Sequence, residues 1–157
     1  MRSFNGFGGF IGRLSVVVAV VMGSGATALA KPSTGTIYFT DHVLDPNSST
    51  FEKDVTKSKA VFEKTGDSWN LFFVAYLKKP AGATEVNLAF YETTAGKREN
   101  VNAIPIQGIK DTSRTVMSSV QLSTEQSFKP GHKYEVLVTR LINGKEEVYA
   151  RSKIELK

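Results

Sequence analysis

The residues best able to do chemistry are few and lie apart in the sequence. The chain has two histidines, His42 and His132, and no cysteine, which excludes a disulfide scaffold, a thiol nucleophile and a thiolate zinc site. His42 lies in the densest set of potential metal ligands, Asp41-His42-Val43-Leu44-Asp45. Because a metal site needs several converging ligands, we interpret this segment as a polar strand end at which Asp45 opens a turn. We predict no metal and no other cofactor.

Catalytic motifs are equally scarce. After residue 30 the sequence contains no G-x-S-x-G elbow, no H-E-x-x-H motif, no phosphate-binding glycine loop and no dinucleotide fingerprint. Adjacent acids such as Glu146 and Glu147 follow a lysine, as in a solvated surface. We therefore predict that the protein is not an enzyme. A small hydrolase or metal-dependent enzyme that uses His42 or His132 stays open as an alternative.

A run of aromatic and aliphatic residues is the candidate for a binding site. If residues 71–77 pair with residues 85–91 in a hairpin, alternation sends successive side chains to opposite faces of the sheet. The wholly apolar face is the predicted core and includes Phe72, Val74 and Tyr76. The opposite face carries four further apolar residues, which we predict to form the binding site: Trp69, Leu71, Phe73 and Tyr91.

Two plainer explanations of that second face stay open. A neighbouring segment, residues 43–58, could cover it, or a one-residue slip in register could exchange the two faces. An exposed face of this kind would offer rings for protein contacts or for stacking on sugars. In the exposed case, replacing Phe72 by Ala should cost more stability than replacing Phe73.

Short strands separated by turns must position these residues. Pro105 favours an edge position for its strand, because proline lacks the N–H that an interior ladder needs. The dipeptide Asn143-Gly144 is a strong hairpin signal, and we expect a one-residue bulge after it that pairs Val138 with Val148. Alternating β-branched and aromatic residues between breakers predict strands over 36–40, 60–64, 68–77, 85–91, 100–106, 114–122, 132–142 and 146–156.

This pattern predicts an all-β fold, an antiparallel sandwich of about seven to eight strands. Residues 128–139, F-K-P-G-H-K-Y-E-V-L-V-T, resemble the entry to the second-last strand of fibronectin type III and related immunoglobulin-like domains. The resemblance implies an immunoglobulin-like sandwich in which Tyr134 is the tyrosine corner, with its hydroxyl bound to the backbone upstream. It implies core positions for Val136 and Val138. Such a resemblance bears on fold and not on function.

Residues 1–30 have the order of a secretory signal. A positive start precedes an apolar core over residues 14–22, and small residues end in Ala28-Leu29-Ala30. A membrane span needs about 20 apolar residues, and this core is shorter. We therefore predict a cleaved signal peptide, a single domain over residues 31–157, no stable membrane span, and a secreted or periplasmic location.

The charge pattern argues against a nucleic-acid partner. The chain has 20 Lys+Arg against 15 Asp+Glu, and loss of the two arginines in the signal leaves 18 against 15, a net charge of +3. The remaining charges alternate in sign, as on a solvated surface. We predict an exported, non-enzymatic binding or accessory module that acts on a protein partner through a sheet face or an edge strand. The alternative is a carbohydrate-binding module that uses the aromatic face.

Overall fold

A computed structural model describes residues 31–157 and shows an all-β fold; the predicted signal peptide lies outside the described residues. Eight strands confirm the predicted number, and helix is confined within this range to α1 (Phe51–Val55) and a 3-10 turn, η1 (Thr124–Gln126). The strands are β1 (Thr36–Thr40), β2 (Val61–Phe62), β3 (Ser68–Tyr76), β4 (Glu85–Glu92), β5 (Glu99–Gln107), β6 (Thr115–Ser123), β7 (His132–Ile142) and β8 (Lys145–Leu156).

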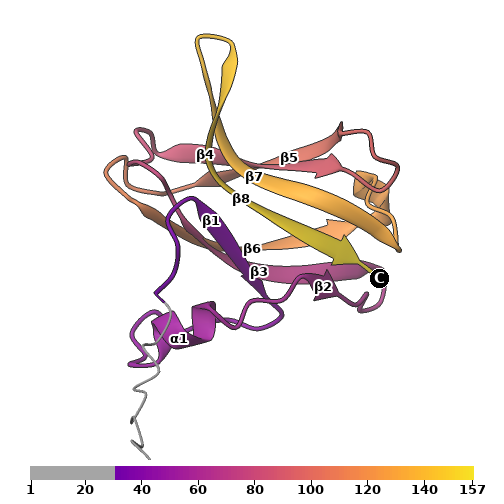
Figure 1. The fold of residues 1–157 in the computed structure, drawn as a ribbon, viewed down its shortest axis with the longest axis horizontal. Helices are drawn as coiled ribbons and strands as arrows, with labels where there is room; N and C mark the ends of the chain where they lie inside the picture. The colour runs from indigo at the N-terminus through magenta and orange to yellow at the C-terminus, as the bar shows by residue number, and fades with distance from the viewer. Residues whose placement is uncertain (1–30) are drawn as a thin grey trace, which may run out of the picture.

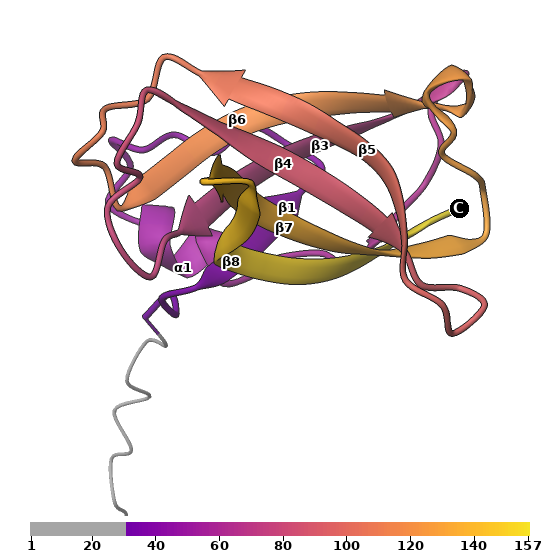
Figure 2. The same ribbon diagram turned by 90° about the horizontal axis from the view of Figure 1, so that it is seen from above.

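The strands form one mixed sheet that curls almost into a barrel (Figures 1 and 2). Their order is β5-β4-β7-β8-β1-β3-β6, with β2 paired to β8 outside this path. Figure 1 shows β4 and β5 above β3 and β6, so we call β5-β4-β7 the upper layer and β1-β3-β6 the lower layer. Strand β8 joins the layers and runs parallel to β1 and β2. The expectation of a purely antiparallel arrangement is therefore wrong at β8.

The predicted hairpin between residues 71–77 and 85–91 does not form. Strand β3 pairs with β1 and β6, whereas β4 pairs with β5 and β7. The connecting segment carries the chain from the lower layer to the upper one. There the Ala81 N–H donates to the Ser113 carbonyl at 2.9 Å, and Gly82, at φ +66°, donates to the Asp111 carbonyl at 2.7 Å. These bonds fix a crossing between layers in place of a hairpin turn.

The last hairpin turns at Asn143-Gly144, as predicted, but its bulge lies elsewhere. Both turn residues have positive φ, 51° and 76°, as a two-residue type I′ turn requires. The register shifts after Val138, which pairs with Ala150 and not with Val148. Tyr149 is the extra residue, and both it and Ala150 are buried in the core. The bulge thus places two consecutive side chains on the core face.

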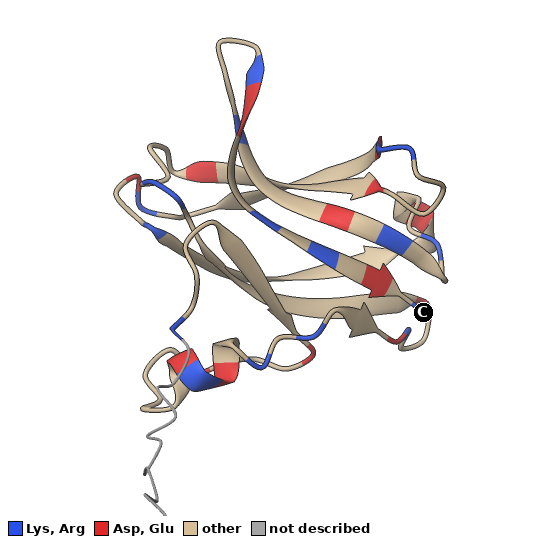
Figure 3. Ribbon diagram, in the orientation of Figure 1, with Lys and Arg blue, Asp and Glu red and all other residues tan. Residues whose placement is uncertain are grey.

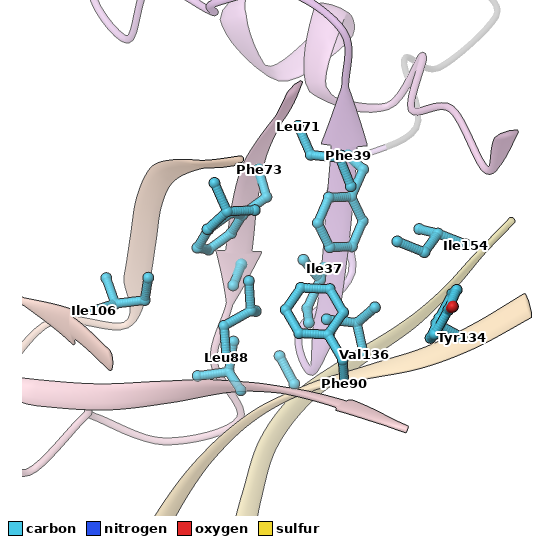
Figure 4. Close-up of a cluster of buried hydrophobic side chains, with 14 of the residues drawn as sticks. Ile37, Phe39, Leu71, Phe73, Leu88, Phe90, Ile106, Tyr134, Val136 and Ile154 are labelled. Carbon is cyan, nitrogen blue, oxygen red and sulfur yellow. The ribbon is translucent and has the colours of Figure 1, made fainter. Parts of the chain in front are cut away.

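The core fills the space between the two layers. Figure 4 shows Phe39 and Phe73 from the lower layer facing Phe90 and Val136 from the upper one. The buried Tyr134 packs edge-on against Phe128, with ring centroids 5.4 Å apart.

The tyrosine-corner hydrogen bond that the resemblance implies is present. The hydroxyl of Tyr134 accepts a hydrogen bond from the backbone N–H of Lys129 at 2.8 Å. Val136 and Val138 are buried in the core, as expected. The pKa of the Tyr134 hydroxyl is raised, first because of its burial.

We predict that Tyr134→Phe lowers the free energy of unfolding by about 1–3 kcal/mol, because it leaves the Lys129 N–H without its partner. Urea denaturation would measure the change. The matched control is Tyr38→Phe, since the Tyr38 hydroxyl accepts an exposed bond from the Ser33 N–H at 2.7 Å. Equal losses of unfolding free energy in the two variants would show that the buried bond at Tyr134 stabilises the fold no more than the exposed bond at Tyr38.

Candidate functional site

Three of the four predicted site residues lie in the core. Trp69 and Leu71 are 0% exposed and Phe73 is 1% exposed, and Figure 4 shows Leu71 and Phe73 among core side chains. The Trp69 indole N–H donates inward to the Lys157 carbonyl at 2.8 Å. The predicted assignment of faces on β3 is therefore inverted, because β3 pairs with β1 and β6 and not with β4, and these residues cannot form an exposed contact surface.

Tyr91 lies apart from the other three, on the outer face of the upper layer. The Arg98 guanidinium sits 3.6 Å from the centroid of its ring, and its hydroxyl donates to Glu146 Oε1 at 2.7 Å. Partial burial, and then this bond, raise the pKa of Tyr91. Arg98 also donates to Glu135 at 2.7 Å. Tyr91 therefore belongs to a network of charged side chains, and the four predicted residues do not converge.

The segment of residues 43–58 does cover a face of β3, but the opposite one from that expected. Its Leu44 and Val55 are buried against Val74, the outward residue at the middle of β3. Tyr38 and Tyr76 pack edge-on beside them, with ring centroids 6.0 Å apart. The outer face of the lower layer is thus partly covered by its own chain.

Where this cover ends, an apolar groove of about 290 Å³ remains open. Phe72 and Val74 form its floor, and the loop residue Val43, 70% exposed, forms one wall. Met117 of β6, 44% exposed, stands on the other side. The groove lining is Thr40, Val43, Leu44, Phe72, Phe73, Val74, Met117, Ser118 and Ser119. Such a lining suits one or two apolar side chains.

The strands beneath this groove carry no charge at all. None of the residues in β1, β3 and β6 is Lys, Arg, Asp or Glu, and Figure 3 shows their ribbons without blue or red. In contrast, β7 and β8 carry paired charges across the ladder, such as Glu135 opposite Lys153 and Lys133 opposite Glu155. The two outer surfaces of the sheet therefore differ: the surface over β7 and β8 carries charged side chains, and the strands β1, β3 and β6 carry none.

Strand β6 ends the sheet beside the groove. It pairs with β3 over nine residues without a break in register. The Leu77 N–H donates to the Arg114 carbonyl at 2.8 Å, so alternation directs the backbone groups of the even-numbered residues of β6 toward β3. The odd-numbered residues direct theirs outward. We call these outward groups, of Thr115, Met117, Ser119 and Gln121, the free edge of β6.

The chain itself closes the far end of this edge. The Ser123 N–H donates to Gln126 Oε1 at 3.1 Å, and its carbonyl accepts from the Phe128 N–H at 3.3 Å. No ladder within residues 31–157 pairs the free edge with another strand. The only sequence signal for this site is the absence of charge over residues 115–123.

The two histidines each pair with a carboxylate, on separate surfaces. His132 Nδ1 lies 2.6 Å from Glu92 Oε1, and this contact lowers the pKa of Glu92. His42 Nδ1 lies 2.9 Å from Asp41 Oδ1. A hydrogen bond from Lys59, together with His42, lowers the pKa of Asp41 to about 2.

The predicted turn at Asp45 is confirmed, because its carboxylate accepts the Asn47 N–H at 2.9 Å. Within residues 31–157, no three His, Asp or Glu side chains gather in a way that could hold a metal ion. The geometry therefore directs attention to the groove and the free edge.

No protein-family model, no curated protein and no solved structure matches the chain. Within the described residues, no helix has the length and apolar character needed to cross a bilayer.

The inverted faces of β3 reverse the stability expectation drawn from the sequence. We predict that Phe73→Ala lowers the free energy of unfolding by about 3–5 kcal/mol, because it empties a core position. Phe72→Ala should cost clearly less, since its ring is only partly buried. Chemical denaturation of both variants checks this. A larger loss at Phe72 would contradict the observed assignment of faces.

Proposed function

We propose that the protein is an exported, non-enzymatic binding module that takes an extended segment of a protein partner onto the free edge of β6. The observation that carries this proposal is the edge itself. Nine consecutive residues, Thr115–Ser123, contain no charge and no proline and pair with β3 without a bulge. Natural edge strands are usually protected against strand pairing by charged side chains, prolines or bulges, and β6 has none of these.

The chemistry of the free edge favours a polypeptide over other ligands. Its outward N–H and C=O groups alternate along the strand, and an added strand satisfies both kinds in register. The outward side chains of that strand would lie beside Met117 and Ser119, at the open side of the groove. Main-chain bonds would then supply affinity, and an apolar side chain seated in the groove would supply selectivity.

The other end strand, β5, is protected in the ways that β6 is not. It contains Pro105 and begins at Glu99, and its register with β4 shifts between Phe90 and Tyr91. The Ala103 N–H is occupied by the neighbouring Asn102 side chain at 2.8 Å. This contrast supports β6 as the pairing edge.

Two sequence features complete the proposal. The signal-like order of residues 1–30 supports a secreted or periplasmic location, and the corner at Tyr134 supports a relationship to immunoglobulin-like domains. The carbohydrate-binding alternative loses its support, because the rings of Trp69 and Phe73 are buried.

The test replaces one edge-facing residue on each end strand. Ser119→Pro removes an outward N–H and spares the bonds to β3, and Ala103→Pro is the matched change on β5. The gene product, expressed from the whole sequence, would capture a protein from an envelope extract, and the captured protein would then be titrated against each variant. We expect Ser119→Pro to weaken its binding about tenfold or more and Ala103→Pro to leave it unchanged.

Hydrogen exchange gives the position of the contact. At a concentration where the protein is a single chain, adding the captured protein should slow exchange at the amides of Met117, Ser119 and Gln121. Equal binding by both proline variants, or protection confined to other strands, would refute the proposal. Circular dichroism of each variant confirms that the fold is retained.

A further inference from the structure

We infer that the segment which pairs with the free edge is the same edge of a second copy of this chain, so that two β6 strands join the lower layers into one continuous sheet. This inference rests on the proposed function of β6 and names its partner. It follows from the symmetry of the free edge, from its side chains and from the position of the groove.

The free edge is symmetric about Ser118. Its four residues are bounded by the Ala81–Ser113 bond on one side and by the closed end at Ser123 on the other. An antiparallel pair of β6 strands centred on Ser118 sets Thr115 opposite Gln121 and Met117 opposite Ser119. All four residues of each copy then find a partner, and each pair exchanges two backbone hydrogen bonds. No other register uses the whole edge of both copies.

The side chains agree with this register on both faces. On the inner face, this register sets Val116 of one copy opposite Val120 of the other; both side chains are already buried in the core of their own chain, so neither obstructs the pairing. On the outer face, Met117 lies beside the other copy's Ser119. Because β6 has no charged residue, the two-fold axis brings no like charges together, which is the usual obstacle to self-pairing of an edge.

The groove explains why Met117 is exposed in a single chain. Ser119 and Met117 line the open side of the groove above Phe72. A two-fold axis through Ser118 brings the grooves of the two copies together on one face and places each Met117 side chain at the border of the other copy's groove. Its flexible thioether suits an apolar gap of this kind.

Cysteine cross-linking tests the register, because the chain contains no native cysteine. At the axis, the two Ser118 residues form a non-hydrogen-bonded pair with Cα atoms about 4.5 Å apart, within the range of a disulfide. The two Ser119 residues are offset by two positions, roughly 7 Å or more apart, beyond that range. In the gene product expressed from the whole sequence, Ser118→Cys should therefore form a disulfide-linked dimer on mild oxidation. Ser119→Cys should form at least tenfold less of this disulfide-linked dimer.

Sedimentation of the unmodified protein gives the second measurement. At micromolar concentration we expect the wild type to have twice the mass of a single chain. Ser119→Pro should have the mass of a single chain. Ser119→Lys serves as a second edge variant if the proline variant fails to fold. A monomeric wild type, or equal cross-linking at both cysteine positions, would overturn the inference. In that case, loss of captured protein in Ser119→Pro but not in Ala103→Pro would still support the proposed function with a different partner. If neither variant loses the captured protein, the inference and the proposed function are both refuted.

Discussion

The burial of one face of β3 is the constraint on which the rest of this structure depends. Its odd-numbered residues, from Trp69 to Ala75, fill the core between the layers together with Leu77 just beyond its end. Its even-numbered residues must then face outward, where Val74 and Tyr76 anchor the segment containing α1 and Phe72 is left as the groove floor. Because β6 pairs with β3 along its whole length, the same face sets the direction of the free edge. Core, groove and edge are thus one consequence of the orientation of a single strand.

The positions of the strands could be predicted from the sequence, but the way they associate could not. Local signals are sufficient for the Asn143-Gly144 turn and the edge position of Pro105. The resemblance of residues 128–139 implied the bond between the Tyr134 hydroxyl and the upstream backbone, which is present. The face of β3 is different, because residues 71–77 are apolar on both faces and alternation carries no information there. Nearness in sequence then suggested a hairpin with β4. The crossing held by Ala81 and its neighbour depends on bonds to a segment about thirty residues away in the chain, which local patterns do not encode.

The candidate site was missed for a related reason. Aromatic rings are the most conspicuous candidates for a binding site in this sequence, yet large rings are more often buried than exposed. The free edge of β6 is recognised by features that the strand does not have. Charge, proline and bulges are absent from β6, and this absence acquires meaning only once the sheet order places β6 at an end. An identical sequence in the middle of the sheet would be an ordinary interior strand.

Self-pairing of β6 and the addition of a strand from any other protein cannot be independent, because both use the same backbone groups. A partner strand can add only to a chain whose edge is free, so its apparent affinity is the intrinsic affinity multiplied by the fraction of chains that are unpaired. At a fixed concentration of partner, a lower concentration of this chain favours the partner complex and a higher one favours the dimer, since only the dimer consumes two copies of the chain. A free edge that runs from Thr115 to Gln121 without charge, proline or bulge is a hazard for a protein that remains single. Closing it against itself in one two-fold register satisfies its backbone groups, ends the sheet without further growth, and leaves the edge available by dissociation.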